Sequence, residues 1–108
     1  MTVQENPPAS KISTIYLSGP MTGMLAFNYP AFHAEAAKLR ELGYCVFNPA
    51  ETDLSEAATW QEHMREDLRA LLDCDRIHLL PGFGKSKGAM LELVVAQALG
   101  MTITIAKP

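Results

Sequence analysis

One stretch of the chain decides its fold: Gly82-Phe83-Gly84-Lys85-Ser86-Lys87-Gly88-Ala89-Met90-Leu91-Glu92. A short apolar strand ends just before this stretch, the glycines and lysines form a loop, and a helix begins at its end. From residue 89 to residue 99 the only polar side chains are those of Glu92 and Gln97. A helix with so few polar side chains has no broad face for solvent. Glu92 is therefore an isolated carboxylate on an apolar helix, and its place there needs a physical reason.

Outward from this stretch, strand patterns alternate with helix patterns. Segments rich in β-branched and aromatic residues predict strands at residues 12–18, 44–47, 76–80 and 101–105. Apolar periodicity predicts helices over residues 28–42, 59–73 and 89–99. Strands that alternate with helices in this way are joined by right-handed crossovers and run parallel. We therefore expect an α/β fold: a compact flavodoxin- or Rossmann-like parallel sheet of about four strands with helices on both faces.

The helix periodicity also predicts which side chains face the core. The apolar stripe of the first helix comprises Phe32, Ala36, Leu39 and Leu42. That of the second helix, which Thr59 and Glu62 open with the spacing of a capping box, comprises Trp60, Met64, Leu68, Leu71 and Leu72. Asp67 lies on this second stripe, three residues after Met64 and four before Leu71. It is the second carboxylate that helical spacing directs inward.

Length and composition limit the class of protein. The 108 residues suffice for one domain, which we place at residues 11–108 after a flexible leader, residues 1–10, that contains Pro7 and Pro8. The net charge of −3 argues against a surface for polymeric nucleic acid, whose binding requires many basic side chains. The sequence has neither a window apolar enough for a membrane span nor a signal peptide. We expect a cytoplasmic protein with no membrane partner.

The cysteines and histidines do not form a metal-binding pattern. Cys45 and Cys74 fall in predicted apolar elements and are interpreted as two small buried side chains in a reducing compartment. His33 and His78 are interpreted as a surface residue and a strand residue. No His, Cys and Asp cluster has the spacing of metal ligands. We expect neither a metal ion nor an organic cofactor.

Topology places the candidate site before any motif does. In an open parallel sheet, ligands bind beyond the carboxyl ends of the strands. Three strand ends supply candidate ligand-binding residues, which are Ser18, Gly19, Pro20, Met21, Thr22 and Gly23 after the first strand, Asn48 after the second, and Gly84, Lys85, Ser86, Lys87 and Gly88 after the third. We expect these loops to meet at one edge of the sheet.

The loop from Gly82 to Gly88 permits two interpretations. Free backbone N–H groups, the positive end of the helix dipole, Lys85 and Lys87 would together bind a phosphate or another anion. Alternatively, the loop is a plain solvated connection with Ser86 as the N-cap of the helix. The sequence is neither a P-loop nor a G-x-G-x-x-G fingerprint.

The two carboxylates also permit two interpretations each. Glu92 either serves a site, or has a structural role in which it reaches the surface past small neighbours or pairs with an Arg or Lys. The space beside it would suit a sugar or a base. Asp67 either joins it or pairs with His63 at the helix surface. Two carboxylates without a metal ion point to chemistry at an acetal-like carbon, where an oxocarbenium-like centre needs nearby negative charge.

These residues resemble the nucleoside 2-deoxyribosyltransferase superfamily, which includes the deoxynucleoside 5′-monophosphate N-glycosidases; small uncharacterised phage and bacterial members look most similar. The resemblance covers about residues 12–99. It is carried by three segments, which are Tyr16-Leu17-Ser18-Gly19-Pro20-Met21-Thr22-Gly23, Glu66-Asp67-Leu68 with Cys74-Asp75, and Ser86-x-Gly88-x-x-x-Glu92. Ser86 stands where the transferases have Asp, as in the monophosphate hydrolases, whereas Thr22 stands where those hydrolases have a basic residue.

The resemblance implies a role for each matching residue. Glu92 would attack C1′ of a 2-deoxyribosyl group and form a covalent ester, which water or a second base resolves with retention of configuration. Asp67 would orient the sugar or assist proton transfer, and Tyr16 would position Glu92 or the sugar. Ser86 and Gly88 would hold a 5′-phosphate. The substrate would be a nucleoside or its 5′-monophosphate.

Two other functions remain open from the sequence. The chain could be a nucleotide-binding or regulatory module without catalytic activity, or a glycohydrolase that cleaves NAD. The resemblance also implies a site at a subunit boundary, and the helix over residues 89–99, apolar on all sides, independently predicts a covering partner. We expect a homodimer or a higher homo-oligomer.

Overall fold

The computed structural model of the chain describes residues 13–52, 54 and 57–108. The predicted leader, residues 1–10, and the first residue of the predicted first strand lie outside the described residues. In the described part of the chain, four parallel strands form one sheet in the order β2-β1-β3-β4. They are β1 (Thr14–Ser18), β2 (Cys45–Phe47), β3 (Arg76–Leu79) and β4 (Thr102–Ile105).

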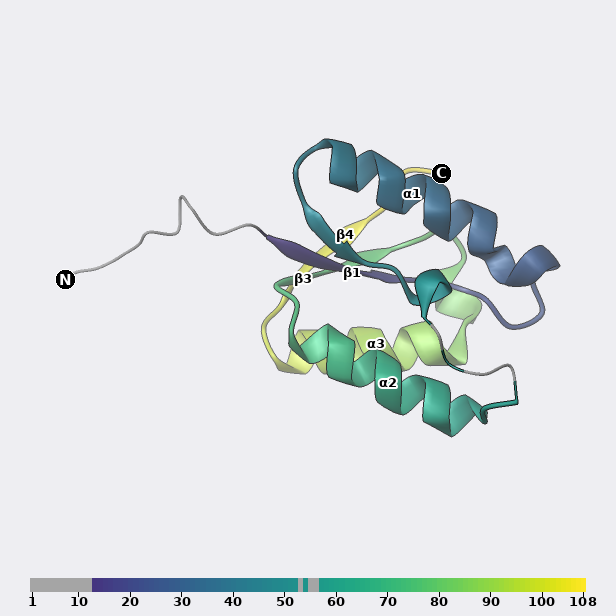
Figure 1. Cartoon of the computed structure of the whole chain (residues 1–108). Coiled ribbons are helices and arrows are strands. Elements are labelled where there is room, and N and C mark those ends of the chain that lie inside the picture. Colours follow the sequence, from purple (N-terminus) through teal and green to yellow (C-terminus); the bar gives the residue numbers. More distant parts are fainter. Residues whose placement is uncertain (1–12, 53, 55–56) are drawn as a thin grey trace.

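Helices cover both faces of this sheet (Figure 1). Helix α1 (Tyr29–Glu41) packs on one face, and α2 (Trp60–Leu72) and α3 (Lys87–Ala98) pack on the other. Among the described residues, three 3-10 turns lie in the loops, namely η3 (Leu25–Asn28), η4 (Pro49–Glu51) and η5 (Phe83–Lys85). The predicted α/β fold with a parallel sheet between two helical layers is confirmed, with element ends within about two residues of those expected.

The alternation of side chains along β1 builds the core on both sides of the sheet. Ile15 and Leu17 point toward α1, where they pack against Phe32 and its neighbours. Tyr16 points to the other face and packs in the cluster that contains Leu71 of α2. Residues 15–18 of β1 are buried, as expected for a central parallel strand covered on both sides.

The α1 layer contains a buried histidine whose two ring nitrogens both have partners. His78 of β3 lies 2.6 Å from the Thr104 hydroxyl through Nδ1 and 2.8 Å from a Glu35 carboxylate oxygen through Nε2. These contacts connect β3, the edge strand β4 and α1, so they explain how a polar side chain is accommodated in this layer. His78 is a strand residue, as predicted.

Two leucines that the sequence pattern assigned to the buried stripes of the helices are exposed in the structure. Leu42 is 70% exposed because α1 ends at Glu41 and Leu42 belongs to the turn that follows. Leu72 is 60% exposed because Leu71, its neighbour in the last turn of α2, takes the buried position. Successive helical residues point about 100° apart, so both cannot face the same core.

The prediction that both cysteines are buried is wrong. Cys45 is exposed on β2, an edge strand with a neighbour on one side only. Cys74 is half-buried after the end of α2, where its thiol donates to the Ala70 carbonyl at 3.3 Å. Burial raises the pKa of the Cys74 thiol to about 11, so this thiol is largely protonated at neutral pH.

Candidate active site

A cleft of about 1100 Å³ opens at the carboxyl ends of β1 and β3, between the first turns of α2 and α3. Most of the residues predicted to bind a ligand line it, as do both inward carboxylates; these are Tyr16, Ser18, Gly19, Pro20, Met21, Thr22, Asp67, Lys85, Ser86, Lys87, Gly88 and Glu92. The chain thus brings the ends of two strands and the starts of two helices together around one concave surface, which is the usual position of a ligand site in this type of sheet.

Glu92 is buried, with 5% of its surface exposed, and both of its carboxylate oxygens accept hydrogen bonds from β1. The Tyr16 hydroxyl donates to Oε2 at 2.7 Å. The Ser18 hydroxyl donates to Oε1 at 2.6 Å. Because Tyr16 and Ser18 are two positions apart on a strand, their side chains emerge on the same face and reach one carboxylate together. The isolated acid of α3 is therefore held within the cleft and does not extend to the surface.

Burial decides the charge of Glu92. It raises the pKa of this carboxyl from its ordinary 4.5 to about 7, against the opposing effect of the hydroxyl groups of Ser18 and Tyr16. The charge of Asp67 raises it further. At neutral pH the carboxyl is consequently divided between its protonated and charged forms. Perturbed acids of this kind, in a cleft, are typical of catalytic sites.

Asp67 is the second acid of the cleft. It is half-buried on α2, and burial followed by the charge of Glu66 raises its pKa to about 6. His63, one turn earlier on α2, also lines the cleft. An acid that titrates near neutrality can accept or donate a proton during a reaction.

Tyr16 is fixed by a stacking contact as well as by its hydrogen bond. Its ring lies against Phe47 of β2 with centroids 5.4 Å apart and planes 9° from parallel. Burial, and then the neighbouring Glu92 carboxylate, raise the pKa of Tyr16 well above its ordinary value. The phenol therefore keeps its proton and acts as a hydrogen-bond donor to Glu92.

The loop before α3 has one of the two roles predicted for it. Ser86 is the N-cap of α3, because its hydroxyl accepts from the Ala89 N–H at 3.1 Å, and it also faces the cleft. A Cβ atom on Gly88 would lie 3.1 Å from the Met64 sulfur, so this glycine allows α2 and α3 to approach closely. The N-cap interpretation of Ser86 is confirmed, and the anion-binding interpretation stays a prediction.

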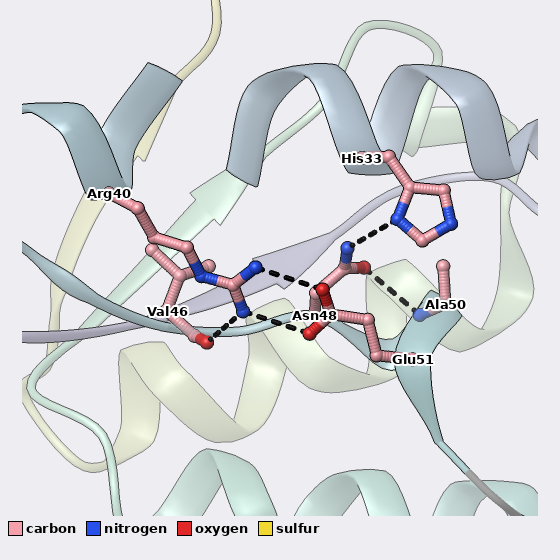
Figure 2. Close-up of polar contacts among 6 residues, drawn as sticks. All are labelled: His33, Arg40, Val46, Asn48, Ala50 and Glu51. Atoms are coloured by element: carbon pink, nitrogen blue, oxygen red, sulfur yellow. Dashed lines mark hydrogen bonds and ion pairs between the residues drawn. The ribbon is translucent and has the colours of Figure 1, made fainter. Parts of the chain in front are cut away.

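A polar network supports the wall of the cleft formed by η4 (Figure 2). The Arg40 guanidinium donates to both Glu51 carboxylate oxygens at 2.8 Å and to the Val46 carbonyl at 2.9 Å. Its hydrogen bonds lower the pKa of Glu51. Asn48 accepts from the Ala50 N–H at 3.0 Å, and its amide nitrogen lies 3.2 Å from Nδ1 of His33. These contacts tie α1 to the loop that contributes Pro49 and Ala50 to the cleft.

Three of the predicted ligand-binding residues do not line the cleft. Gly23 and Gly84 are exposed outside it. Asn48 is buried beneath the η4 wall, with 2% of its surface exposed, where its side chain caps a turn of the protein itself. Its position after β2 was predicted correctly, but the side chain points into the protein.

The cleft also has an aromatic and apolar lining that sequence reasoning did not assign to the site. The residues concerned include Phe27, Tyr29, Phe32, Trp60, His63 and Met64. Trp60 and His63 could have been found, because helical spacing places them near Asp67. Phe27 could not, because Ala26, Phe27 and Asn28 adopt left-handed backbone angles, with φ of 51°, 52° and 61°, that non-glycine residues seldom adopt and no sequence signal announces.

The described part of the chain contains neither a metal-binding cluster nor a membrane-spanning helix. Within residues 13–52, 54 and 57–108, no group of three or more His, Cys, Asp or Glu side chains is arranged to hold a metal ion. Over the same residues, no helix has the length and apolarity needed to cross a membrane.

The sequence matches one protein family over nearly its whole length. The model of the family described as "Domain of unknown function (DUF4406)" matches residues 13–105. The chain belongs to the DUF4406 family. No curated protein matches this DUF4406 chain. The matched residues include every strand and helix that forms the cleft.

Solved structures share the fold of the DUF4406 chain. The 2-deoxyribosyltransferase of the psychrotolerant bacterium Bacillus psychrosaccharolyticus superposes with a TM-score of 0.70 at 22% identity, over 86% of this chain and 71% of the other. The 2-desoxiribosyltransferase from Leishmania mexicana superposes with a TM-score of 0.66 at 21% identity, over 86% of this chain and 63% of the other. At these identities the likeness establishes the fold, and the fold expected from the resemblance is confirmed.

Proposed function

We propose that this DUF4406 chain cleaves or transfers the N-glycosidic bond of a 2′-deoxynucleoside or its 5′-monophosphate, with Glu92 as the nucleophile. The observation that carries the proposal is the buried Glu92 carboxylate, held by two hydroxyl groups in the cleft at the strand ends. Two solved structures of the same fold are 2-deoxyribosyltransferases, which supports this class of reaction.

The first step forms a covalent intermediate. A charged Glu92 oxygen attacks C1′ of the sugar, a C1′–O bond forms, and the C1′–N bond breaks with its electron pair moving to the base. The departing base takes up a proton from solvent, because Asp67, whose pKa is about 6, is largely charged at the pH at which Glu92 is charged. Attack requires the charged form of Glu92, so the rate should increase as the pH rises through about 7.

The second step releases the sugar. Water or a second base attacks C1′ from the face that the first base left, the C1′–O bond to Glu92 breaks, and its electron pair returns to the carboxylate. The charged form of Asp67 accepts the proton of the attacking group. Two displacements at the same carbon retain its configuration.

The loop before α3 supplies the anion subsite of the proposal. Lys85, Ser86, Lys87 and Gly88 face the cleft at the amino end of a helix, where backbone N–H groups and the helix dipole favour a phosphate. A 5′-monophosphate bound there would place its sugar toward Glu92, which lies one and a half turns further along α3.

A panel of nucleosides and 5′-monophosphates tests the proposal. Base release is measured for the wild type and for Glu92→Gln, with Glu41→Gln, which removes an exposed carboxylate of α1, as the matched control. We expect release that is lost in Glu92→Gln and kept in the control. Addition of a second base distinguishes transfer from hydrolysis through the appearance of a new nucleoside. Release that survives in Glu92→Gln overturns the assignment of Glu92 as the nucleophile. Tight binding with no release by the wild type or either variant favours a non-catalytic binding module.

We also propose that the chain forms a homodimer or a higher homo-oligomer. Apolar side chains remain exposed on α3 and on the edge strand β4, with Val94 56% and Ile105 60% exposed. Burial of such a surface favours association. Light scattering at micromolar concentration measures the mass, and a monomer under these conditions contradicts the proposal.

A further inference from the structure

We propose that Ser18 is a positioning residue: its hydroxyl orients the Glu92 carboxylate and stabilises its charged form, and this is its role in place of direct substrate binding. The inference rests on the proposed function of Glu92 for its catalytic consequence. Its structural part, the effect of Ser18 on Glu92, stands on the geometry of β1 and α3.

The position of Ser18 is fixed by the sheet. It is the last residue of β1, it pairs with Leu79 of β3, and its carbonyl accepts from the Leu80 N–H at 2.8 Å. The next residue must be a glycine, because a Cβ atom on Gly19 would lie 2.8 Å from the Cβ atom of Leu80. Ser18 is 1% exposed. A side chain on so constrained a backbone is well placed to hold another group in one orientation.

The hydroxyl of Ser18 has one proton, and it is donated to Glu92. The distance of 2.6 Å to Oε1 is that of a strong hydrogen bond to a carboxylate. While this bond exists, Ser18 can accept a hydrogen bond from a ligand but cannot donate one. The geometry therefore favours a role through Glu92 over a role in recognising a substrate acceptor group.

Ser18 and Tyr16 divide the two oxygens of Glu92 between them. Tyr16 holds Oε2 and Ser18 holds Oε1, so the plane of the carboxylate is set before a substrate arrives. Such preorganisation removes a reorientation step from the approach to C1′. Both bonds also favour the charged carboxylate against the cost of burial, and Ser18 opposes the rise in the pKa of Glu92 more than Tyr16 does.

Removal of the Ser18 hydroxyl has a consequence that depends on pH. In Ser18→Ala, Oε1 would lose its donor in a buried environment, and the protonated form of Glu92 would be favoured. A hydrogen bond to a charged group has a strength that corresponds to an upward shift of about 1–2 pH units in the midpoint. The acid limb of kcat/KM should move upward by that amount. At pH values below the midpoint of this limb, activity should fall by about 10- to 100-fold relative to the wild type, and at higher pH it should recover in part.

Direct titration of Glu92 separates this inference from the proposed reaction. Carboxyl carbon NMR of the ligand-free protein measures the Glu92 midpoint whether or not any nucleoside is cleaved. We expect a higher midpoint in Ser18→Ala and a midpoint close to wild type in Ser18→Thr, which keeps the hydroxyl. Thr14→Ala is the matched control, because it removes a hydroxyl from the same strand and face about 13 Å away.

Two results would overturn the inference. One is an unchanged Glu92 midpoint in Ser18→Ala. The other is an activity loss of equal size at every pH, which a structural or substrate-binding role would produce. Thermal unfolding followed by circular dichroism checks that each variant folds. If Ser18→Ala does not fold, Ser18→Cys has a similar volume and a weaker donor, and a smaller upward shift is expected from it.

Discussion

The ammonium nitrogen of Lys87 lies 4.4 Å from the centre of the Trp60 ring, so the first residue of α3 contacts the first residue of α2 across the mouth of the cleft. Both residues line the cleft. A cation over an exposed aromatic ring contributes about 0.5–1 kcal/mol, which is less than a lysine gains from a well-placed phosphate. A phosphate at the start of α3 would therefore draw Lys87 away from the ring.

This contact predicts an optical signal for anion binding. Trp60 is the only tryptophan of the chain, so tryptophan fluorescence reports on the surroundings of this one side chain, which include Lys87. We expect 2′-deoxynucleoside 5′-monophosphates to change the emission and the corresponding nucleosides to change it less. Lys87→Gln should alter the emission of the free protein and weaken the response to monophosphates. Equal responses in the wild type and in Lys87→Gln would show that this lysine does not hold the phosphate.

The close approach of β1 and β3 at the floor of the cleft predicts a cost for Gly19→Ala. The added Cβ atom would lie 2.8 Å from the Leu80 Cβ, an atom attached to the backbone, so the strand ends would have to separate. Overpacking of this kind costs about 1–3 kcal/mol. Urea denaturation measures the change in the free energy of unfolding. Gly84→Ala is the control, because nothing lies within 4 Å of its added Cβ, and a similar loss in both variants would contradict the steric cause.

We predict that two substitutions of the buried Asn48 lower the free energy of unfolding by different amounts. Asn48→Ala removes the side-chain oxygen that accepts from the Ala50 N–H, whereas Asn48→Asp keeps an acceptor there. We expect Asn48→Ala to lower the free energy of unfolding by about 1–2 kcal/mol, as for loss of a helix cap or a buried hydrogen bond. Asn48→Asp should cost less at neutral pH. Equal losses, measured by urea denaturation, would mean that the contact with His33 matters more than the cap.

The sequence predicted the sheet and the general place of the site because those features depend on local patterns. Alternation of strand and helix signals specifies the parallel sheet, and the sheet places its strand ends at one edge. Glu92 and Asp67 were recognised because each is a carboxylate at a helical position that should be apolar. Such a conflict between residue type and helical position can be recognised from the sequence alone.

Features that depend on contacts between distant segments of the chain were harder to predict from the sequence. The joint hold of Tyr16 and Ser18 on Glu92 follows from strand alternation only once α3 is known to lie over that face of β1. Asn48 was placed at the right strand end, but the direction of its side chain depends on the η4 turn. The exposure of Cys45 depends on the order of the strands, which puts β2 at an edge.

The raised pKa of Glu92 predicts how this residue affects stability as the pH changes. The folded carboxyl titrates near 7 and its ordinary value is 4.5, so between these values the folded state holds a proton that the unfolded state has lost. The contribution of Glu92 to stability is therefore largest below about 4.5 and is lost as the pH rises through about 7. The full effect is on the order of 3 kcal/mol.

Glu92→Gln isolates this effect because glutamine does not titrate. The variant should gain stability relative to the wild type as the pH rises from 5 to 8. Asp67, whose pKa is also raised, titrates in both proteins, and its contribution cancels apart from its interaction with the Glu92 charge. Urea denaturation at several pH values measures the difference. A difference that stays constant with pH would show that Glu92 titrates alike in the folded and unfolded chains. In that case the cleft would not raise the pKa of the proposed nucleophile, and the expected rise of activity through pH 7 would need another titrating group.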